Sequence, residues 1–266
     1  MVTPRISASS YSNTAPLVWS FLYGFGRGSV ELIMDNAPAR SAELLAQDRV
    51  DAALVPVIAY QMLDDVRLVP DVCVGAKKRV QSVCLVTKGE ELADVRSVAL
   101  DVSSRTSVVL TKVIFREFLG FEPTWHDAQP DINAMVATND AALIIGDPAL
   151  ALSEPGAIAT ELRTFDLAEL WHQHSGLGFV FAMWMTRRSN ISVDFVAARD
   201  EGIHNLGRIA RNYAENIGID ESAMLSYLTD SISYSVDDSM RQGMELYFSL
   251  AEKHGLIEKD RPIDYI

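Results

Sequence analysis

The order of predicted strands and helices is the feature that most constrains the fold of this chain. Strand-like apolar stretches at residues 4–9, 30–35 and 50–60 alternate with helix-like stretches at 13–25 and 41–49. Within the second helix, Ser41 is predicted as the N-cap residue. A β-α-β-α-β order is typical of a parallel sheet with helices on both faces. The sequence therefore predicts an α/β fold.

The same alternation starts again at Ser97. A strand at 97–102 precedes a helix that is predicted to end at Gly120, and further strands are predicted at 122–127 and 141–147. A long apolar strand at 177–187 follows, and from Val193 onward the chain consists of amphipathic helices. This order predicts two lobes with a ligand cleft between them and with C-terminal helices.

We expect the lobes to be discontinuous in sequence. Residues 1–88 and 178–266 are predicted to form the first lobe, and residues 89–177 the second. The prediction rests on the restart of the β-α alternation and on the return strand at Leu177.

Charge and composition exclude several classes of function. The chain of 266 residues has 36 acidic and 23 basic residues and a formal net charge of −13, so nucleic-acid and anionic-membrane binding are not expected. An anionic ligand would have to be bound by local donors. The N-terminus "MVTPRIS" has no apolar signal core, which indicates a cytoplasmic protein. Cys73 and Cys84 are predicted to be buried and reduced, in preference to forming a disulfide.

Two clusters of small polar residues follow the first strand of each α/β unit. "SSYSNT" (9–14) and "VSSRTS" (102–107) both precede a helix, and "IGDPAL" (145–150) is a third strand-to-helix turn. Helix N-termini attract anions, although such residues also serve as ordinary helix caps. We expect Arg105 either to contact an anion or to be solvated. Asp147 is either a base or a helix cap, and the cap is favoured.

Familiar catalytic and metal-binding motifs are absent from the sequence. There is no G-x-S-x-G, Walker A, H-E-x-x-H or EF-hand pattern. His172 and His174 have no third ligand nearby, so no metal site is expected. His126 and Asp127 are either a base with its orienting group or surface residues, and the second alternative is favoured.

Six segments together carry a resemblance to a known family. "SYSNTAPL", "RVDAALVPV", "QSVCLVTK", "LDVSSRTSVVLTKVI", "ALIIGDPAL" and "ELWHQHSGLGFVFAMW" occur in order between residues 10 and 184. They resemble the chorismate dehydratases of the futalosine route to menaquinone. The resemblance implies a type II periplasmic-binding-protein fold, no cofactor, and dehydration of chorismate to 3-[(1-carboxyvinyl)oxy]benzoate. Ser12 stands where leucine is usual in the family.

The resemblance also implies which residues form the site. Asn13 and Ser82 match the family's active-site asparagine and pocket serine, and residues 103–107 match its carboxylate-binding loop. The full set of expected substrate-binding residues is Ser10, Tyr11, Thr14, Ser103, Ser104, Arg105, Thr106, Ser107, Gly146 and Asp147. Asn13 and Ser82 are expected to position the reacting groups, and the substrate's own enolpyruvyl carboxylate to remove the proton.

Two other functions stay open at this stage. One is a cytosolic organic-anion-binding or sensor protein without catalysis. The other is the sister dihydroxynaphthoate synthase of the same pathway, which is expected to use a histidine base in its cleft.

Overall fold

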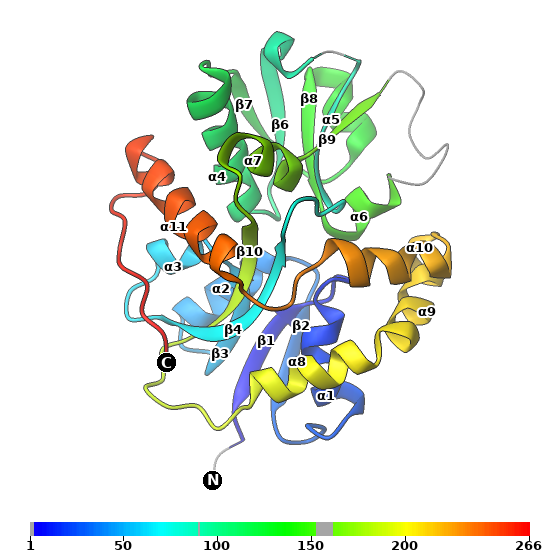
Figure 1. Ribbon diagram of the computed structural model, residues 1–266, viewed down its shortest axis with the longest axis vertical. Coiled ribbons are helices and arrows are strands. Elements are labelled where there is room, and N and C mark those ends of the chain that lie inside the picture. The colour runs from blue at the N-terminus through cyan, green and yellow to red at the C-terminus, as the bar shows by residue number, and fades with distance from the viewer. Residues whose placement is uncertain (1–2, 90, 153–161) are drawn as a thin grey trace.

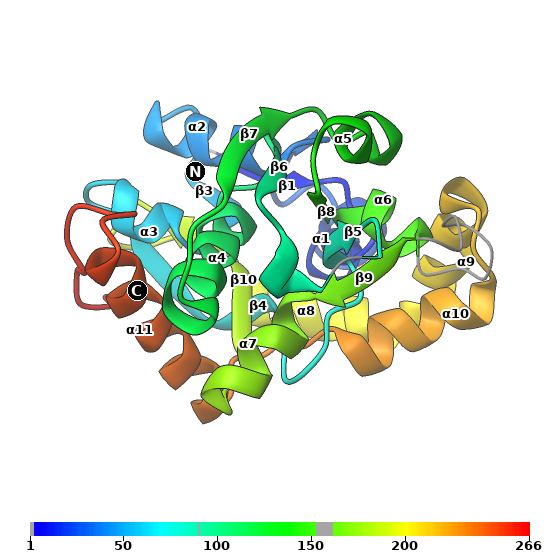
Figure 2. The same ribbon diagram turned by 90° about the horizontal axis from the view of Figure 1, so that it is seen from above.

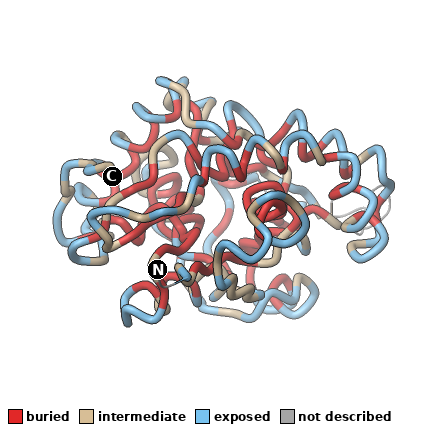
Figure 3. The backbone as a smooth tube through the Cα atoms, turned by 90° about the horizontal axis from the view of Figure 1, so that it is seen from below, coloured by how far each residue is buried: buried red, intermediate tan, exposed pale blue. Residues whose placement is uncertain are grey.

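The computed structural model describes residues 3–89, 91–152 and 162–266. Its strands form two separate five-stranded sheets, which lie one above the other in Figure 1. One apolar core cluster contains buried residues of both sheets, and Figure 3 shows the buried backbone running through the interior. No helix within the described residues is both long and apolar enough to cross a membrane.

The first sheet has the order β2-β1-β3-β10-β4. Its strands are β1 (Arg5–Ser9), β2 (Glu31–Asp35), β3 (Ala52–Pro56), β4 (Arg67–Ala76) and β10 (Phe179–Thr186). The strands β1, β2 and β3 are parallel, whereas β10 is antiparallel to both β3 and β4. The sheet is therefore mixed, and the prediction of a purely parallel sheet is wrong.

The second sheet has the order β7-β6-β8-β5-β9. Its strands are β5 (Val83–Thr87), β6 (Ser97–Asp101), β7 (Thr124–Ala128), β8 (Ala141–Ile145) and β9 (Arg163–Asp166). The strands β6, β7 and β8 are parallel, and β5 is antiparallel to β8 and β9. A helical crossover is needed only where two neighbouring parallel strands follow each other in sequence. Strand β5 therefore enters the second sheet directly from β4 of the first sheet, with no helix between them.

Strand pairing bears on one of the two predicted lobe boundaries. The prediction assigned residues 83–87 to the first lobe, but this segment, β5, pairs only with strands of the second sheet. The chain thus passes between the sheets at residues 77–82 and returns just before β10. We propose that the lobes divide at these two crossovers, which Figure 2 shows from above.

Helices cover both sheets. Those that follow strands of the first sheet are α1 (Ala15–Tyr23), α2 (Pro38–Ala46) and α3 (Ala59–Met62). Those of the second are α4 (Thr106–Val113), which continues as a π-helical turn (Ile114–Leu119), α5 (Ile132–Thr138), α6 (Gly146–Ala151) and α7 (Leu167–Ser175), with a short 3₁₀ turn at Leu92–Asp94. The predicted end at Gly120 is confirmed, with φ of +77° at this residue.

The C-terminal part of the described chain is helical, as predicted. It contains α8 (Phe195–His204), α9 (Leu206–Ile217), α10 (Glu221–Ser226) with a π-helical turn (Tyr227–Ser231), and α11 (Asp238–Lys253). Helix α8 packs against α1 so closely that a Cβ at Gly202 would lie 1.7 Å from the carbonyl oxygen of Pro16. Helix α11 packs against both β10 and α4 and so contacts elements of both sheets.

Two local predictions have different outcomes. Ser41 does not cap α2, because the helix begins at Pro38, whose fixed φ suits a first helical position. The Ser41 side chain is instead buried and shares a hydrogen bond of 2.8 Å with Ser7. Cys73 and Cys84 are free and buried, which confirms the prediction.

Candidate active site

A cavity lies between the two sheets. From the first sheet and its helices it is lined by Ser9, Tyr11, Asn13, Thr14, Pro38, Leu54, Pro56, Val74, Phe181 and Ala182. From the crossover and the second sheet it is lined by Val80, Val83, Ser104, Thr106, Ser107, Ile145 and Gly146.

The beginnings of three helices border this cavity. Thr14 is the N-cap of α1, Pro38 is the first residue of α2, and Thr106 and Ser107 are the first two of α4. A helix N-terminus carries a partial positive charge from its aligned peptide dipoles. The positive ends of α1, α2 and α4 therefore favour negative charge on a bound molecule.

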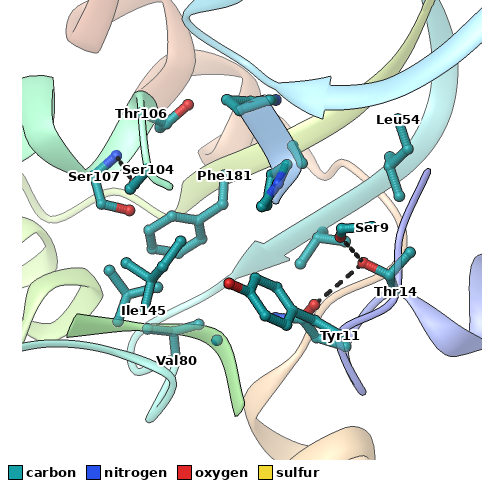
Figure 4. A pocket seen from close by; sticks show the side chains of 17 residues that line it. Ser9, Tyr11, Thr14, Leu54, Val80, Ser104, Thr106, Ser107, Ile145 and Phe181 are labelled. Carbon is teal, nitrogen blue, oxygen red and sulfur yellow. Dashed lines mark hydrogen bonds between the residues drawn. The ribbon is translucent and has the colours of Figure 1, made fainter. Parts of the chain in front are cut away.

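The described lining residues carry no charged side chain. The polar lining consists of hydroxyl groups and one amide, that of Asn13. The remaining surface is largely aliphatic, with the aromatic rings of Phe181 and Tyr11. In the view of Figure 4, Ser104, Thr106 and Ser107 lie on one side and Ser9 and Thr14 on the other. Such a lining suits a ring with polar substituents at opposite ends.

The amide oxygen of Asn13 is held by the neighbouring side chain of Thr14. The Thr14 hydroxyl donates to Asn13 Oδ1 at 3.3 Å, and Ser9 shares a hydrogen bond of 3.0 Å with Thr14. Asn13 lines the cavity, and its role toward a ligand stays a prediction.

Ser82 lies behind the cavity wall and is not one of its lining residues. Its side chain is buried, and its hydroxyl accepts a hydrogen bond of 2.7 Å from the Tyr227 hydroxyl. The Ser82 carbonyl oxygen accepts from the backbone N–H of Gly146 at 2.7 Å. Ser82 thus contacts the cavity wall through the backbone of Gly146, and its other partner, Tyr227, was not predicted from sequence.

Tyr11 and Gly146 meet across the two sheets. Gly146 has φ of +68°, and a Cβ built there would lie 2.7 Å from the Tyr11 ring. Burial raises the pKa of Tyr11, and a hydrogen bond with Ser103 opposes this effect. Ser103 in turn donates to Asp101 from its N–H at 2.8 Å and its hydroxyl at 2.6 Å. Ser103 therefore supports Tyr11 but does not itself line the cavity.

Asp147 forms a second contact between the sheets. Its carboxylate accepts hydrogen bonds from the backbone N–H of Ser12 at 3.0 Å and from the Ser12 hydroxyl at 2.6 Å. Burial raises the pKa of Asp147 above its usual value, although the bonds from Ser12 lower it. The favoured prediction of a helix cap is wrong, because α6 begins at Gly146 with Ile145 as its N-cap. Asp147 is also not a lining residue.

Two other predicted binding residues point elsewhere. The Ser10 hydroxyl donates to Asn36 Oδ1 at 2.9 Å on the exposed side of its loop. Arg105 is exposed, and its guanidinium lies 3.9 Å from Glu43 Oε1. The structure thus gives no support to a contact between Arg105 and a ligand in the cavity.

None of the chain's five histidines lines the cavity. His126 lies on β7 and shares a hydrogen bond of 2.7 Å with Asn139, which uses one ring nitrogen. His172 and His174 lie on helix α7. The cavity therefore lacks the histidine base that the sister synthase is expected to use.

Several lining residues were not predicted from sequence. Ser9 belongs to the polar cluster that was singled out, whereas Pro38 and Phe181 lie outside it. Pro38 carried a signal that was overlooked, because proline is common at the start of a helix. Phe181 reads as an ordinary residue of a buried strand, and only the position of β10 beside β3 and β4 brings it to the cavity.

Comparison with solved structures agrees with this architecture. Protein AF1704 of Archaeoglobus fulgidus matches with a TM-score of 0.73 at 18% identity, covering 96% of this chain and 98% of that one. The periplasmic aliphatic sulphonate-binding protein SsuA of Escherichia coli matches with a TM-score of 0.63 at 16% identity, covering 99% and 93%. The predicted periplasmic-binding-protein-like fold is confirmed.

Comparison by sequence is more specific. A chorismate dehydratase of Thermus thermophilus is 31% identical over 264 residues, which cover 92% of this chain and 93% of the relative. A family model described as menaquinone biosynthesis matches residues 4–253. The expected family resemblance is confirmed, and the chain belongs to this menaquinone biosynthesis family.

Proposed function

We propose that this protein is a cytoplasmic lyase that dehydrates chorismate to 3-[(1-carboxyvinyl)oxy]benzoate. The observation that carries the proposal is an uncharged cavity bordered by the N-termini of α1, α2 and α4, in a chain 31% identical to a chorismate dehydratase. Chorismate carries one carboxylate on its ring and a second on its enolpyruvyl side chain, so it needs anion-binding groups at separate places around an apolar slot.

Binding in this cavity is expected to depend on neutral donors. The hydroxyls of Ser104, Thr106 and Ser107 lie at the start of α4, where peptide dipoles add to their hydrogen bonds. Thr14 is at the corresponding place on α1. We propose that each group binds one carboxylate and that the ring packs against Phe181. Neutral donors limit the electrostatic cost of placing a dianion in a chain with net charge −13.

The reaction removes the C3 proton and the C4 hydroxyl, which leave as water, and the ring becomes aromatic. Because aromatisation drives the reaction, the protein's task is to align the leaving group and stabilise developing charge. No histidine, lysine or carboxylate lines the described part of the cavity. We propose that the substrate's enolpyruvyl carboxylate takes the proton and transfers it to the leaving hydroxyl, while Asn13 orients the reacting groups.

A cytosolic anion-binding or sensor protein is the second candidate, since the fold is shared with the sulphonate-binding protein of Escherichia coli. Incubation with chorismate distinguishes the two, with the product followed by ultraviolet absorbance and mass spectrometry. Formation of the dehydrated aromatic product supports the lyase. Saturable chorismate binding without any product would contradict the lyase and favour the binding protein.

A further inference from the structure

We propose that a pocket lined by Arg67, Arg187 and Arg261 is a second ligand site of this protein and that it binds a phosphate group. The pocket and the cavity between the sheets have no described lining residue in common. The inference therefore goes beyond the proposed function and does not depend on it.

The three arginines come from segments that are far apart in sequence. Arg67 is the first residue of β4, Arg187 directly follows β10, and these two strands are neighbours in the first sheet. Arg261 lies in the segment after α11, which runs beside α3 and β4 in Figure 1. The Tyr60 hydroxyl holds this segment by donating to the carbonyl oxygen of Pro262 at 2.7 Å. The fold thus gathers three cations beside the first sheet.

Two of these cations have only neutral partners. The guanidinium of Arg187 donates to the backbone carbonyl oxygens of Ala46 at 3.1 Å and of Asp64 at 3.2 Å. That of Arg261 donates to the carbonyl oxygen of Tyr60 and lies 4.2 Å from the centroid of the Tyr60 ring. Neither forms an ion pair within the described residues, although the chain has 36 acidic residues. Carbonyl groups orient a guanidinium but do not neutralise its charge.

The same two side chains each have a buried donor without an acceptor. Five buried side-chain nitrogen and oxygen atoms lack a hydrogen-bond partner among the described residues, and the Nε atoms of Arg187 and Arg261 are two of them. A buried N–H group without an acceptor destabilises a protein, and the effect is larger when the group is charged. A bound oxyanion brings both acceptor oxygens and negative charge to this pair of side chains.

Two carboxylates also line the pocket, but they leave these charges unbalanced. Asp264 Oδ2 accepts a hydrogen bond of 2.8 Å from Arg67 Nε and so offsets that arginine. Asp65 is exposed, and it forms no ion pair in the described part of the chain. The charges of Arg187 and Arg261 are therefore the ones left for a ligand.

The arrangement of the donors favours a phosphate group over a carboxylate. The three guanidinium groups reach the pocket from β4, from the end of β10 and from the C-terminal segment. A phosphate group has oxygen atoms in several directions and a charge near −2, whereas a carboxylate has two oxygen atoms in one plane. The planar fork of arginine suits phosphate oxygens in particular.

The first test is calorimetric titration with inorganic phosphate at constant ionic strength, with chloride as the balancing anion. The wild type should bind phosphate saturably, and Arg187→Gln and Arg261→Gln should each raise Kd about tenfold or more. The matched control is Arg188→Gln, which removes the same charge from the next residue. Arg188 is already paired with Asp48 at 3.1 Å and Asp51 at 3.0 Å, so Kd should stay within about twofold.

Two results of this titration would overturn the proposal. One is the absence of saturable phosphate binding to the wild type. The other is an unchanged Kd in both Arg187→Gln and Arg261→Gln, which would show that phosphate binds elsewhere, for example at the helix N-termini of the main cavity.

A spectroscopic test uses the wild-type protein and so does not depend on how stable the variants are. The Nε–H signals of Arg187 and Arg261 in a ¹H–¹⁵N spectrum are those lost in the corresponding Gln variants, or in the Lys variants if a Gln variant fails to fold. Both signals should shift with the same dependence on phosphate concentration, and the Arg188 signal should stay in place. Signals that do not respond to phosphate would overturn the inference.

Two further anions define the chemistry of the ligand. Glycerol 3-phosphate that competes with inorganic phosphate indicates the phosphate group of a larger molecule, whereas its exclusion indicates free phosphate, and either result supports the site. Acetate binding as tightly as phosphate would overturn the assignment to phosphate. Chorismate turnover by Arg187→Gln should stay within about twofold of the wild type. A wild type that is inactive on chorismate would overturn only the proposed function.

Discussion

Ser12 and Asp147 are 135 residues apart in sequence, yet the Ser12 hydroxyl lies 2.6 Å from Asp147 Oδ1 and its backbone N–H lies 3.0 Å from the same oxygen. The first residue belongs to the loop before α1 and the second to the first turn of α6. The contact therefore joins the two halves of the molecule beside the cavity.

Ser12→Ala should lower the free energy of unfolding. Ser12 is fully buried, and the substitution removes one donor from a partly buried carboxylate, which costs about 1–3 kcal/mol. Urea unfolding measures the loss. The matched control is Ser10→Ala, because the Ser10 hydroxyl bonds to Asn36 on the exposed side of the same loop and should contribute far less. Equal losses in the two variants would contradict this role of the Ser12–Asp147 contact.

Asp147→Asn should change how stability depends on pH. Burial raises the pKa of Asp147 in the folded protein, so the folded state binds this proton more tightly than the unfolded state does. The wild type therefore gains stability, relative to Asp147→Asn, as pH falls through the folded pKa toward the ordinary value of about 3.9. Unfolding free energies of both proteins at about pH 7 and about pH 4 test this. If the wild type instead lost stability relative to Asp147→Asn when the pH is lowered, the raised pKa of Asp147 would be contradicted.

Gly146→Ala should impair both folding and ligand binding. Any side chain at φ of +68° is strained by about 1–2 kcal/mol, and here the added Cβ would also displace the Tyr11 ring. Gly120→Ala isolates the first effect, because Gly120 has φ of +77° and nothing lies within 4 Å of its added Cβ. We expect Gly146→Ala to lose more stability than Gly120→Ala, and we expect the KM for the substrate to rise in Gly146→Ala alone. Identical behaviour of the two variants would show that the Tyr11 contact is unimportant.

The sequence predicted the polar strand-to-helix turns well because their chemistry is local. Thr14, Thr106 and Ser107 follow a strand and begin a helix, and both features are readable within a few residues. Strand β4 was missed for an equally local reason. Pro70 and Asp71, with φ of +59° at Asp71, interrupt its pattern, and its pairing with β10 shifts register.

Contacts between segments that are distant in the sequence could not be predicted from it. Tyr227 and Ser82 are 145 residues apart, and a buried tyrosine in a helix indicates core packing unless its partners are known. The same holds for Arg105. Its place in a polar turn suggests an anion contact, but the orientation of the turn directs the side chain toward Glu43 and away from the cavity.

Arg105→Ala is expected to leave KM for chorismate within about twofold of the wild type, because a weak, exposed ion pair contributes little. Steady-state kinetics at moderate ionic strength measure this. A rise in KM of tenfold or more would show that Arg105 binds the substrate and that helix N-termini do not suffice.

The measurement that tests the account most directly is chorismate turnover by wild type and Asn13→Ala, with the melting temperature of each. If Asn13 orients the reacting groups, the wild type forms 3-[(1-carboxyvinyl)oxy]benzoate, and the variant is slower by about a hundredfold or more. The melting temperatures should be nearly equal, since Asn13 lines a cavity and packs no core. Near-normal dehydration by folded Asn13→Ala, or no product from the wild type, would contradict the account.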